Sequence, residues 1–193
     1  MSEDRFSEEK GQLLVRLVRS TIGSRLNADV SEIKPTAADL DAPEFQEHRA
    51  TFVTLHKNGE LRGCIGSLSA VEPLAESVRH NAVNAAFRDP RFKPLSREEL
   101  DRVDIEVSIL TEPRPLDYSD ATDLISKLRA GVDGVILRKG PHSATFLPQV
   151  WNQLPTPGEF LSHLCRKAGL PGDEWKRAHL DISTYQVEYF EEK

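Results

Sequence analysis

The sequence predicts an α+β fold with two β-β-α-β units, at about residues 50–110 and 134–190, after an N-terminal helix over 7–23. Each unit opens with two strand-like runs joined by a tight turn, continues with a capped amphipathic segment and closes with another strand-like run. Strands joined by tight turns pair antiparallel, so we expect mainly antiparallel sheets with packed helices. A chain of 193 residues is long enough to bury such a core.

The elements before the first unit are a helix and an irregular connection. The helix is indicated by apolar residues at helical spacing, namely Leu13, Leu14, Leu17, Val18 and Ile22. Residues 34–49 contain two prolines and no clear period, which is typical of a surface connection.

The first unit begins with a predicted β-hairpin. Residues 50–57 are rich in β-branched and aromatic side chains, Asn58-Gly59 is a strong signal for a two-residue turn, and residues 60–68 run back. A turn of two residues sets the register of the hairpin, in which Val53 should pair with Cys64.

A helix and a third strand complete this unit. Pro73 suits the first turn of a helix over 74–87, whose inward stripe is mostly small: Leu74, Val78, Ala82 and Ala85. Small side chains would let this helix approach a sheet closely. A capping box over 96–99 precedes residues 103–110, which alternate as a strand.

The second unit repeats this order after a short helix around residues 124–128. Residues 134–150 predict two strands around a Gly-Pro turn, and a capping box over 156–159 starts a helix that turns Cys165 inward. The segment ISTYQVEYF, residues 182–190, predicts one closing strand.

Composition and charge exclude several classes of protein. No apolar run approaches the roughly 20 residues that a membrane helix needs, and the acidic start MSEDRFSEEK is unlike a secretory signal, so we expect a cytoplasmic protein without a membrane span. The two cysteines, Cys64 and Cys165, should be free thiols. A net charge of −6 makes nucleic acid an improbable partner.

The segment LRGCIG, residues 61–66, is the first candidate site. In the expected register Arg62 and Cys64 share one face of the strand, where the guanidinium would favour the thiolate form of the cysteine. Gly63 and Gly66 leave the backbone open to a ligand or a bulge. The alternative is that Cys64 is a small buried hydrophobe, as free cysteines often are.

Two further groups of residues are candidates. Asn81, Asn84 and Arg88 share one helix stripe with Ser77, and Arg91 follows in a basic segment that could hold a phosphate or a carboxylate. The alternative is a solvated helix face. Glu106, in the middle of its strand, is either a general base or ion-pair partner, or a surface acid.

No metal or cofactor is predicted. The six histidines are scattered, with no Cys-x-x-Cys and no His-x-x-x-His, although a metal site assembled in space stays open. Gly-rich phosphate loops and dinucleotide fingerprints are also missing from the sequence, which disfavours nucleotide-dependent catalysis.

The sequence resembles the AMMECR1 family, whose hallmark LRGCIG is unbroken here. The resemblance continues in order through AAFRDPRFKPL, IEVSIL, GVDGVIL, ATFLPQVW, FLSHLCRKAGL and YQVEYF, from about Phe6 to Phe190. It implies a single α+β domain over 1–193 with a larger and a smaller lobe. It implies no settled activity, but prokaryotic genes of this family often stand beside, or are fused to, those of a Memo-type protein and a radical SAM enzyme, which suggests a shared pathway.

Two functions are consistent with the sequence. We favour a binding protein that holds a small molecule, an anion or a partner at a cleft lined by the LRGCIG strand, because no complete catalytic set has obvious spacing. The alternative is an enzyme or enzyme subunit in which Cys64 is the nucleophile or redox thiol, Arg62 activates it or holds the substrate, and Glu106 or a histidine moves protons.

Overall fold

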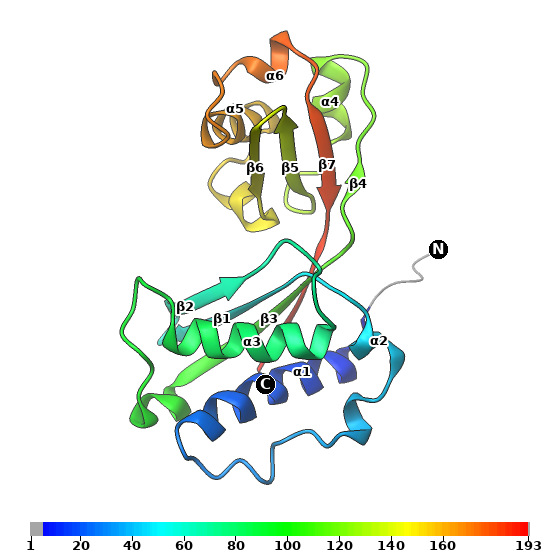
Figure 1. Cartoon of the computed structure of the whole chain (residues 1–193). Coiled ribbons are helices and arrows are strands. Elements are labelled where there is room, and N and C mark those ends of the chain that lie inside the picture. The colour runs from blue at the N-terminus through cyan, green and yellow to red at the C-terminus, as the bar shows by residue number, and fades with distance from the viewer. Residues whose placement is uncertain (1–5, 193) are drawn as a thin grey trace. The chain divides into compact units, whose positions relative to one another are not determined.

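The chain folds into two units, each a four-stranded sheet with helices packed on it, which confirms the α+β prediction (Figure 1). The computed structural model describes residues 6–192. Of these, the first unit takes 6–110 and 188–192, and the second takes Thr111–Val187. Each contains the predicted β-β-α-β order, as β1-β2-α3-β3 and as β5-β6-α5-β7.

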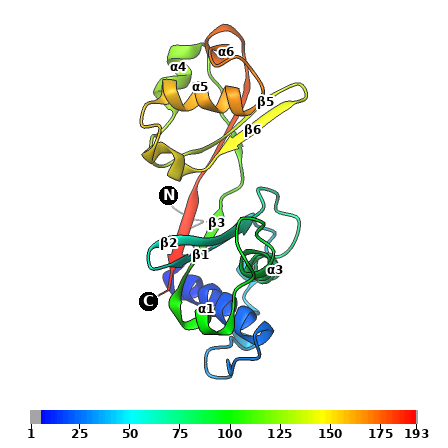
Figure 2. The same ribbon diagram turned by 90° about the vertical axis from the view of Figure 1, so that its left-hand side faces the viewer.

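The first unit has its strands in the order β2-β1-β3-β8. Its elements are α1 (Glu8–Arg25), η1 (Ala38–Leu40), α2 (Pro43–Gln46), β1 (Thr51–Lys57), β2 (Glu60–Gly66), α3 (Leu74–Phe87), η2 (Arg97–Arg102), β3 (Val103–Leu110) and β8 (Val187–Glu191). Strand β1 pairs antiparallel with both β2 and β3. The two long helices α1 and α3 cover one face of this sheet (Figure 2).

The core of the first unit lies between that face and the two helices. The Ser7 side chain caps α1 by accepting the Lys10 N–H, and the apolar stripe of α1 is buried. The predicted inward stripe of α3, Leu74, Val78, Ala82 and Ala85, is buried as well. On the sheet side, Val53, Leu55, Ile105 and Val107 are no more than 2% exposed. The helices therefore pack on alternate residues of each strand.

The second unit has its strands in the order β4-β7-β5-β6, all antiparallel. Its elements are β4 (Arg114–Pro115), α4 (Ala121–Lys127), β5 (Gly134–Lys139), β6 (His142–Phe146), η3 (Pro148–Asn152), α5 (Pro157–Lys167), α6 (Glu174–Arg177) and β7 (Asp181–Tyr185). Thr156 caps α5 as expected, and Cys165 is buried in the core beneath it.

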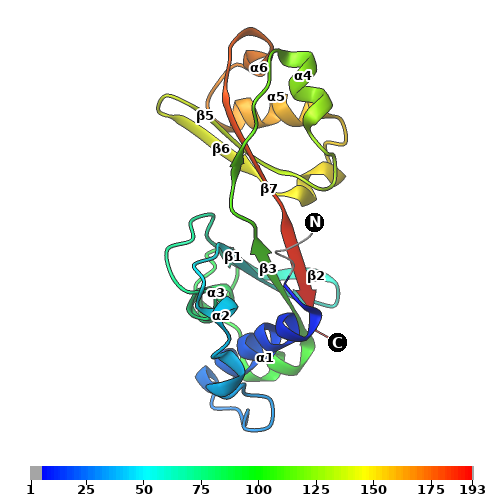
Figure 3. The same ribbon diagram turned by 90° about the vertical axis from the view of Figure 1, so that its right-hand side faces the viewer.

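The prediction of one closing strand is wrong. The segment forms two strands, β7 in the second sheet and β8 in the first, and Figure 3 shows β8 in red beside β3. Ile182 belongs to the second core and Phe190 to the first, and the exposed Gln186 lies between the two strands. A run of strand-forming residues does not say which sheet each residue joins.

The hairpin of β1 and β2 has the predicted turn but not the predicted register. Asn58 and Gly59 have φ of 53° and 79°, as a two-residue turn with the favoured twist requires. His56 then pairs with Leu61, but Leu55 pairs with Gly63. Arg62 is therefore the extra residue of a β-bulge.

The bulge moves every later residue of β2 to the other face of the sheet. Val53 pairs with Ile65, and Cys64 pairs with Thr54, so the expected Val53–Cys64 pair is wrong. Val53 is fully buried under the helices, and a cysteine opposite it would have pointed into the core. Opposite Thr54, Cys64 lies on the outward face and is half-buried.

Gly63 is where β2 comes closest to α3. A Cβ atom built at Gly63 would lie 2.3 Å from the carbonyl oxygen of Ala85, which is backbone and cannot turn away. The small side chain of Ala85 and the missing one of Gly63 together permit this contact.

We predict that Gly63→Ala lowers the free energy of unfolding by at least about 2 kcal/mol, because strand and helix must separate. Gly158→Ala is the matched control and should be neutral or slightly stabilising, since a Cβ there would lie 3.7 Å from the Trp175 ring, an ordinary van der Waals contact. Urea unfolding of both variants measures the difference. Equal effects would show that the close approach does not matter.

Candidate functional site on the first sheet

Three side chains form a row across the outward face of the first sheet. Thr54 on β1 lies between Cys64 on β2 and Glu106 on β3, because it pairs directly with both. The Thr54 hydroxyl donates to the Cys64 Sγ at 3.3 Å. Directly paired residues have their Cβ atoms about 5 Å apart, so one small ligand could contact all three.

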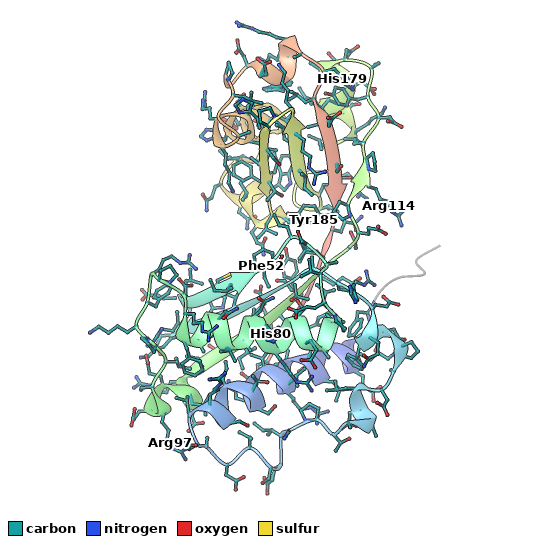
Figure 4. All side chains as sticks on the ribbon, viewed as in Figure 1. Phe52, His80, Arg97, Arg114, His179 and Tyr185 are labelled. Carbon is teal, nitrogen blue, oxygen red and sulfur yellow. The ribbon has the colours of Figure 1, made fainter. Side chains whose placement is uncertain are left out.

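Other polar and aromatic residues continue this face. The buried Ser108 hydroxyl donates to Glu106 at 3.1 Å, and Phe52 pairs with both Ser108 and Gly66. Figure 4 shows Phe52 on the side of the sheet away from α3, the helix that carries His80. The face therefore combines a thiol, hydroxyls, a carboxylate and an aromatic ring.

Arg62 does not share a face with Cys64, which corrects the prediction that its guanidinium faces the thiol. It donates to Glu99 through Nε at 3.2 Å and through Nη2 at 2.9 Å. Lys57 donates to the same carboxylate at 2.7 Å. Lys57 shares the alternation of Val53 and Leu55, so this charged cluster lies toward the helix-covered side.

The Arg62 and Lys57 donors hold the pKa of Glu99 well below its ordinary value, at about 2. The backbone N–H of Ser96 adds a further hydrogen bond to this carboxylate, within the predicted capping box. An ionised and multiply bonded Glu99 leaves Arg62 with little to offer a substrate anion.

The basic segment after α3 is also neutralised from within. Asp89, whose side chain is 1% exposed, accepts from Arg91 through Nε at 2.9 Å and Nη2 at 2.7 Å. This pair keeps the pKa of Asp89 far below its usual range, with hydrogen bonds from Arg91 as the largest cause. Arg62 and Arg91 both lie near the Phe92 ring, at 5.9 and 5.4 Å.

The remaining candidates of α3 divide between the interior and the surface. Asn81 is buried and donates to the carbonyl and hydroxyl of Thr51, whose hydroxyl also bonds Ser77. Asn84 is half-buried, and Arg88 is exposed and bonds its side chain. The stripe is thus neither one cleft wall nor one solvated face.

The two glycines of the motif face protein atoms. Gly63 meets Ala85, and a Cβ at Gly66 would lie 2.3 Å from the Phe52 ring and from the Thr51 carbonyl oxygen. Packing within the unit accounts for both glycines.

Sequence reasoning missed Thr54, Asp89 and Glu99 as residues of this region. Thr54 could have been found from the alternation of β1 only with the correct register. Asp89 reads as a helix stop before Pro90, and Glu99 as half of a capping box. Nothing local in the sequence marks the long-range contacts that both carboxylates make.

No three or more His, Cys, Asp and Glu side chains among residues 6–192 are grouped so that they could hold a metal ion. No helix in the same range has both the length and the apolar character needed to cross a membrane.

Comparison with known proteins identifies the family. The AMMECR1 family profile matches residues 15–190. The chain belongs to the AMMECR1 family. It is 41% identical over 204 residues to a protein of Thermofilum pendens, covering 97% of this chain and 92% of that protein. It is 39% identical over 189 residues to a protein of Methanothermobacter thermautotrophicus, covering 97% and 96%.

A solved structure has the same fold as this AMMECR1-family chain. The crystal structure of an uncharacterised protein from Pyrococcus horikoshii matches with a TM-score of 0.80 at 36% identity, covering 97% of this chain and 94% of that one. In the chain described here, the LRGCIG segment is the edge strand β2, with the bulge at its arginine.

We predict that Glu99→Gln destabilises this AMMECR1-family protein by a few kcal/mol at neutral pH, because Arg62 and Lys57 lose their shared anion. The pKa of Glu99 is lowered on folding, so its stabilising effect is fully present above the ordinary value of 4.5 and is lost as pH falls toward about 2. The gap between parent and variant should therefore close over that range.

Thermal unfolding at a series of pH values measures this gap. Glu60→Gln, an exposed carboxylate on the same hairpin, is the control and should follow the parent throughout. A gap that stays constant down to the lowest pH would contradict the ion-pair explanation.

Proposed function

We propose that the outward face of the first sheet binds a small polar molecule at the row of Cys64, Thr54 and Glu106. The observation that carries this proposal is the direct cross-strand pairing of these residues, with the hydroxyl of Thr54 bonded to the sulfur. A thiol, a hydroxyl and a carboxylate gathered on one sheet face supply donors and acceptors within reach of one ligand.

Charge narrows the class of ligand. Glu106 and Asp104 alternate on this face of β3, whereas Arg62 and Lys57 are bonded to Glu99. Arg91 interacts chiefly with Asp89 and secondarily with Cys64. The face thus favours a molecule with a positive charge or several hydrogen-bond donors over the anion expected from the basic segment.

The same row supports a second function, thiol chemistry at Cys64. The specific observation is the O–H···S hydrogen bond from Thr54, which holds the sulfur in place on this face. In such a reaction the sulfur forms a bond to an electrophilic carbon of the ligand, whose leaving group departs with the bonding electron pair. Glu106 takes up the thiol proton and returns it to the leaving group, so atoms and charge balance.

We predict that Cys64 discriminates between two thiol reagents of equal reactivity and opposite charge. The probes are the trimethylammonium-ethyl and the sulfonato-ethyl methanethiosulfonates, each normalised to its rate with 2-mercaptoethanol. The cationic probe should react roughly threefold to tenfold faster at Cys64, because Glu106 attracts it. Peptide mass spectrometry assigns the modified cysteine, and the buried Cys165 serves as internal reference.

The Glu106→Gln variant should lose most of this preference. Asp181→Asn, an exposed carboxylate on β7 of the second sheet, is the matched control and should retain it. A faster anionic probe, or a preference unaffected by Glu106→Gln, would count against the proposed ligand class. The folded Cys64→Ala variant serves as the blank, because its remaining cysteine, Cys165, is buried.

We also propose, from the family resemblance, that the protein works in the cytoplasm in one pathway with a Memo-type protein and a radical SAM enzyme. Co-expression of the chain with a Memo-type protein from the same genome should give one complex in size-exclusion chromatography. Separate elution of the two proteins at micromolar concentration, in the presence and absence of the radical SAM enzyme, would argue against direct association.

A further inference from the structure

On the unpaired edge of strand β2, the backbone groups of Cys64 are hydrogen-bonded by side chains. Its backbone N–H donates to the Asp89 Oδ2 at 2.9 Å, and its carbonyl oxygen accepts from the Arg91 Nη2 at 3.1 Å. The outermost strand of a sheet ordinarily presents such groups to water or to another strand. Here the Asp89–Arg91 ion pair bonds both the backbone N–H and the backbone carbonyl of Cys64.

We propose that Asp89 and Arg91 are positioning residues that clamp the backbone of Cys64 and so hold its sulfur against Thr54. The inference rests on the proposed function, since it concerns the cysteine of that same site. It assigns a task to Asp89, which bonds the Cys64 backbone, and to Arg91, which bonds the same backbone and also lies close enough to the thiol to interact with it.

The clamp is a closed ring of hydrogen bonds. The Asp89 Oδ2 accepts from Cys64 N and from Arg91 Nη2, and the same Nη2 reaches back to the Cys64 carbonyl. The Asp89 Oδ1 accepts from the backbone N and the Nε of Arg91, at 3.1 and 2.9 Å. Every polar group in the ring has a partner, so the ring is rigid.

Fixing the backbone on both sides of Cys64 leaves one torsion free to move the sulfur. That torsion, χ1, has three staggered positions, and one of them places the sulfur 3.3 Å from the Thr54 hydroxyl. If the edge strand were mobile, the distance between the Cys64 sulfur and the Thr54 hydroxyl would vary. The buried Asp89 carboxylate therefore sets the position of the sulfur indirectly, by holding the Cys64 backbone.

A second ion pair of the same kind provides a matched control. Asp133 and Arg129 in the second unit are bonded at 2.6 Å, with side chains 2% and 58% exposed, against 1% and 53% for Asp89 and Arg91. The Asp133 carboxylate also accepts a backbone N–H, that of Arg129 itself. It bonds no cysteine.

The test compares Asp89→Asn and Arg91→Gln with Asp133→Asn in the full chain. Site-resolved alkylation by iodoacetamide at neutral pH measures the rate at Cys64, and amide hydrogen exchange measures the protection of the Cys64 N–H. Asp89→Asn should slow alkylation roughly threefold to tenfold, because the bond from Thr54 to the sulfur is lost. Arg91→Gln should slow it as well, but this change also removes a cation beside the thiol, so Asp89→Asn is the variant that decides on the rate. Both clamp variants should raise exchange at Cys64, and Asp133→Asn should change neither.

Two outcomes separate positioning from other effects. Removing the negative charge of Asp89 would by itself favour the thiolate and speed alkylation, so a faster rate overturns the proposal. In a Thr54→Val background, Asp89→Asn should have no further effect on the rate, since the contact it positions is already absent. Independent, multiplicative effects of the two changes overturn it as well.

Failure of the proposed function would look different. If Cys64 shows no preference between the two methanethiosulfonate probes, the proposed cationic ligand is contradicted. The differences in hydrogen exchange and alkylation between the clamp variants and the parent would still be expected. Unchanged exchange of the Cys64 N–H in both clamp variants removes the clamp, whatever ligand the face binds. Arg91 is half exposed, so Arg91→Gln should fold even if Asp89→Asn does not.

Discussion

The ion pair of Arg62 with Glu99 is the interaction on which the layout of the first unit depends. A β-bulge leaves one residue without a partner across the ladder, and that residue needs other contacts. Here it is Arg62, whose guanidinium meets a carboxylate that Lys57 and the Ser96 backbone also hold. Because side chains alternate along a strand, this one extra residue decides that Cys64 faces outward and Ile65 inward.

The close approach of β2 and α3 links the bulge to the segment that follows the helix. Gly63, directly after the bulge, lets the strand lie against the backbone of Ala85. Four residues later the helix has ended and Asp89 reaches the next strand residue, Cys64. A helix held further away by larger side chains could not deliver that carboxylate to the strand edge. The small stripe of α3 and the glycine of β2 therefore serve the same contact from opposite sides.

Local sequence patterns predicted most helices, strands and turns of the fold. The hairpin register and the sheet that each closing strand joins depend on long-range contacts, which local patterns do not reveal. The turn at Asn58-Gly59, the capping boxes and the α3 stripe depend on neighbouring residues, and the structure has all of them. The hairpin register depends on Glu99, 37 positions from Arg62. The closing segment is rich in strand-forming residues throughout, although its halves join different sheets. The sequence offers Asn81 as a ligand-binding residue or part of a solvated face, whereas the structure buries it against Thr51, which lies on another element.

The distribution of charge shows why a cluster of basic residues in the sequence was a poor guide to a ligand. Arg62, Lys57 and Arg91 are close in space, but each is bonded to a carboxylate that is itself largely buried. A buried carboxylate with such partners stays ionised, and the cations beside it are neutralised at short range. The charge left to act on an approaching molecule is then that of residues without such partners on the outward face. On the first sheet these are carboxylates of β3, beside a thiol whose place is set by the strand edge.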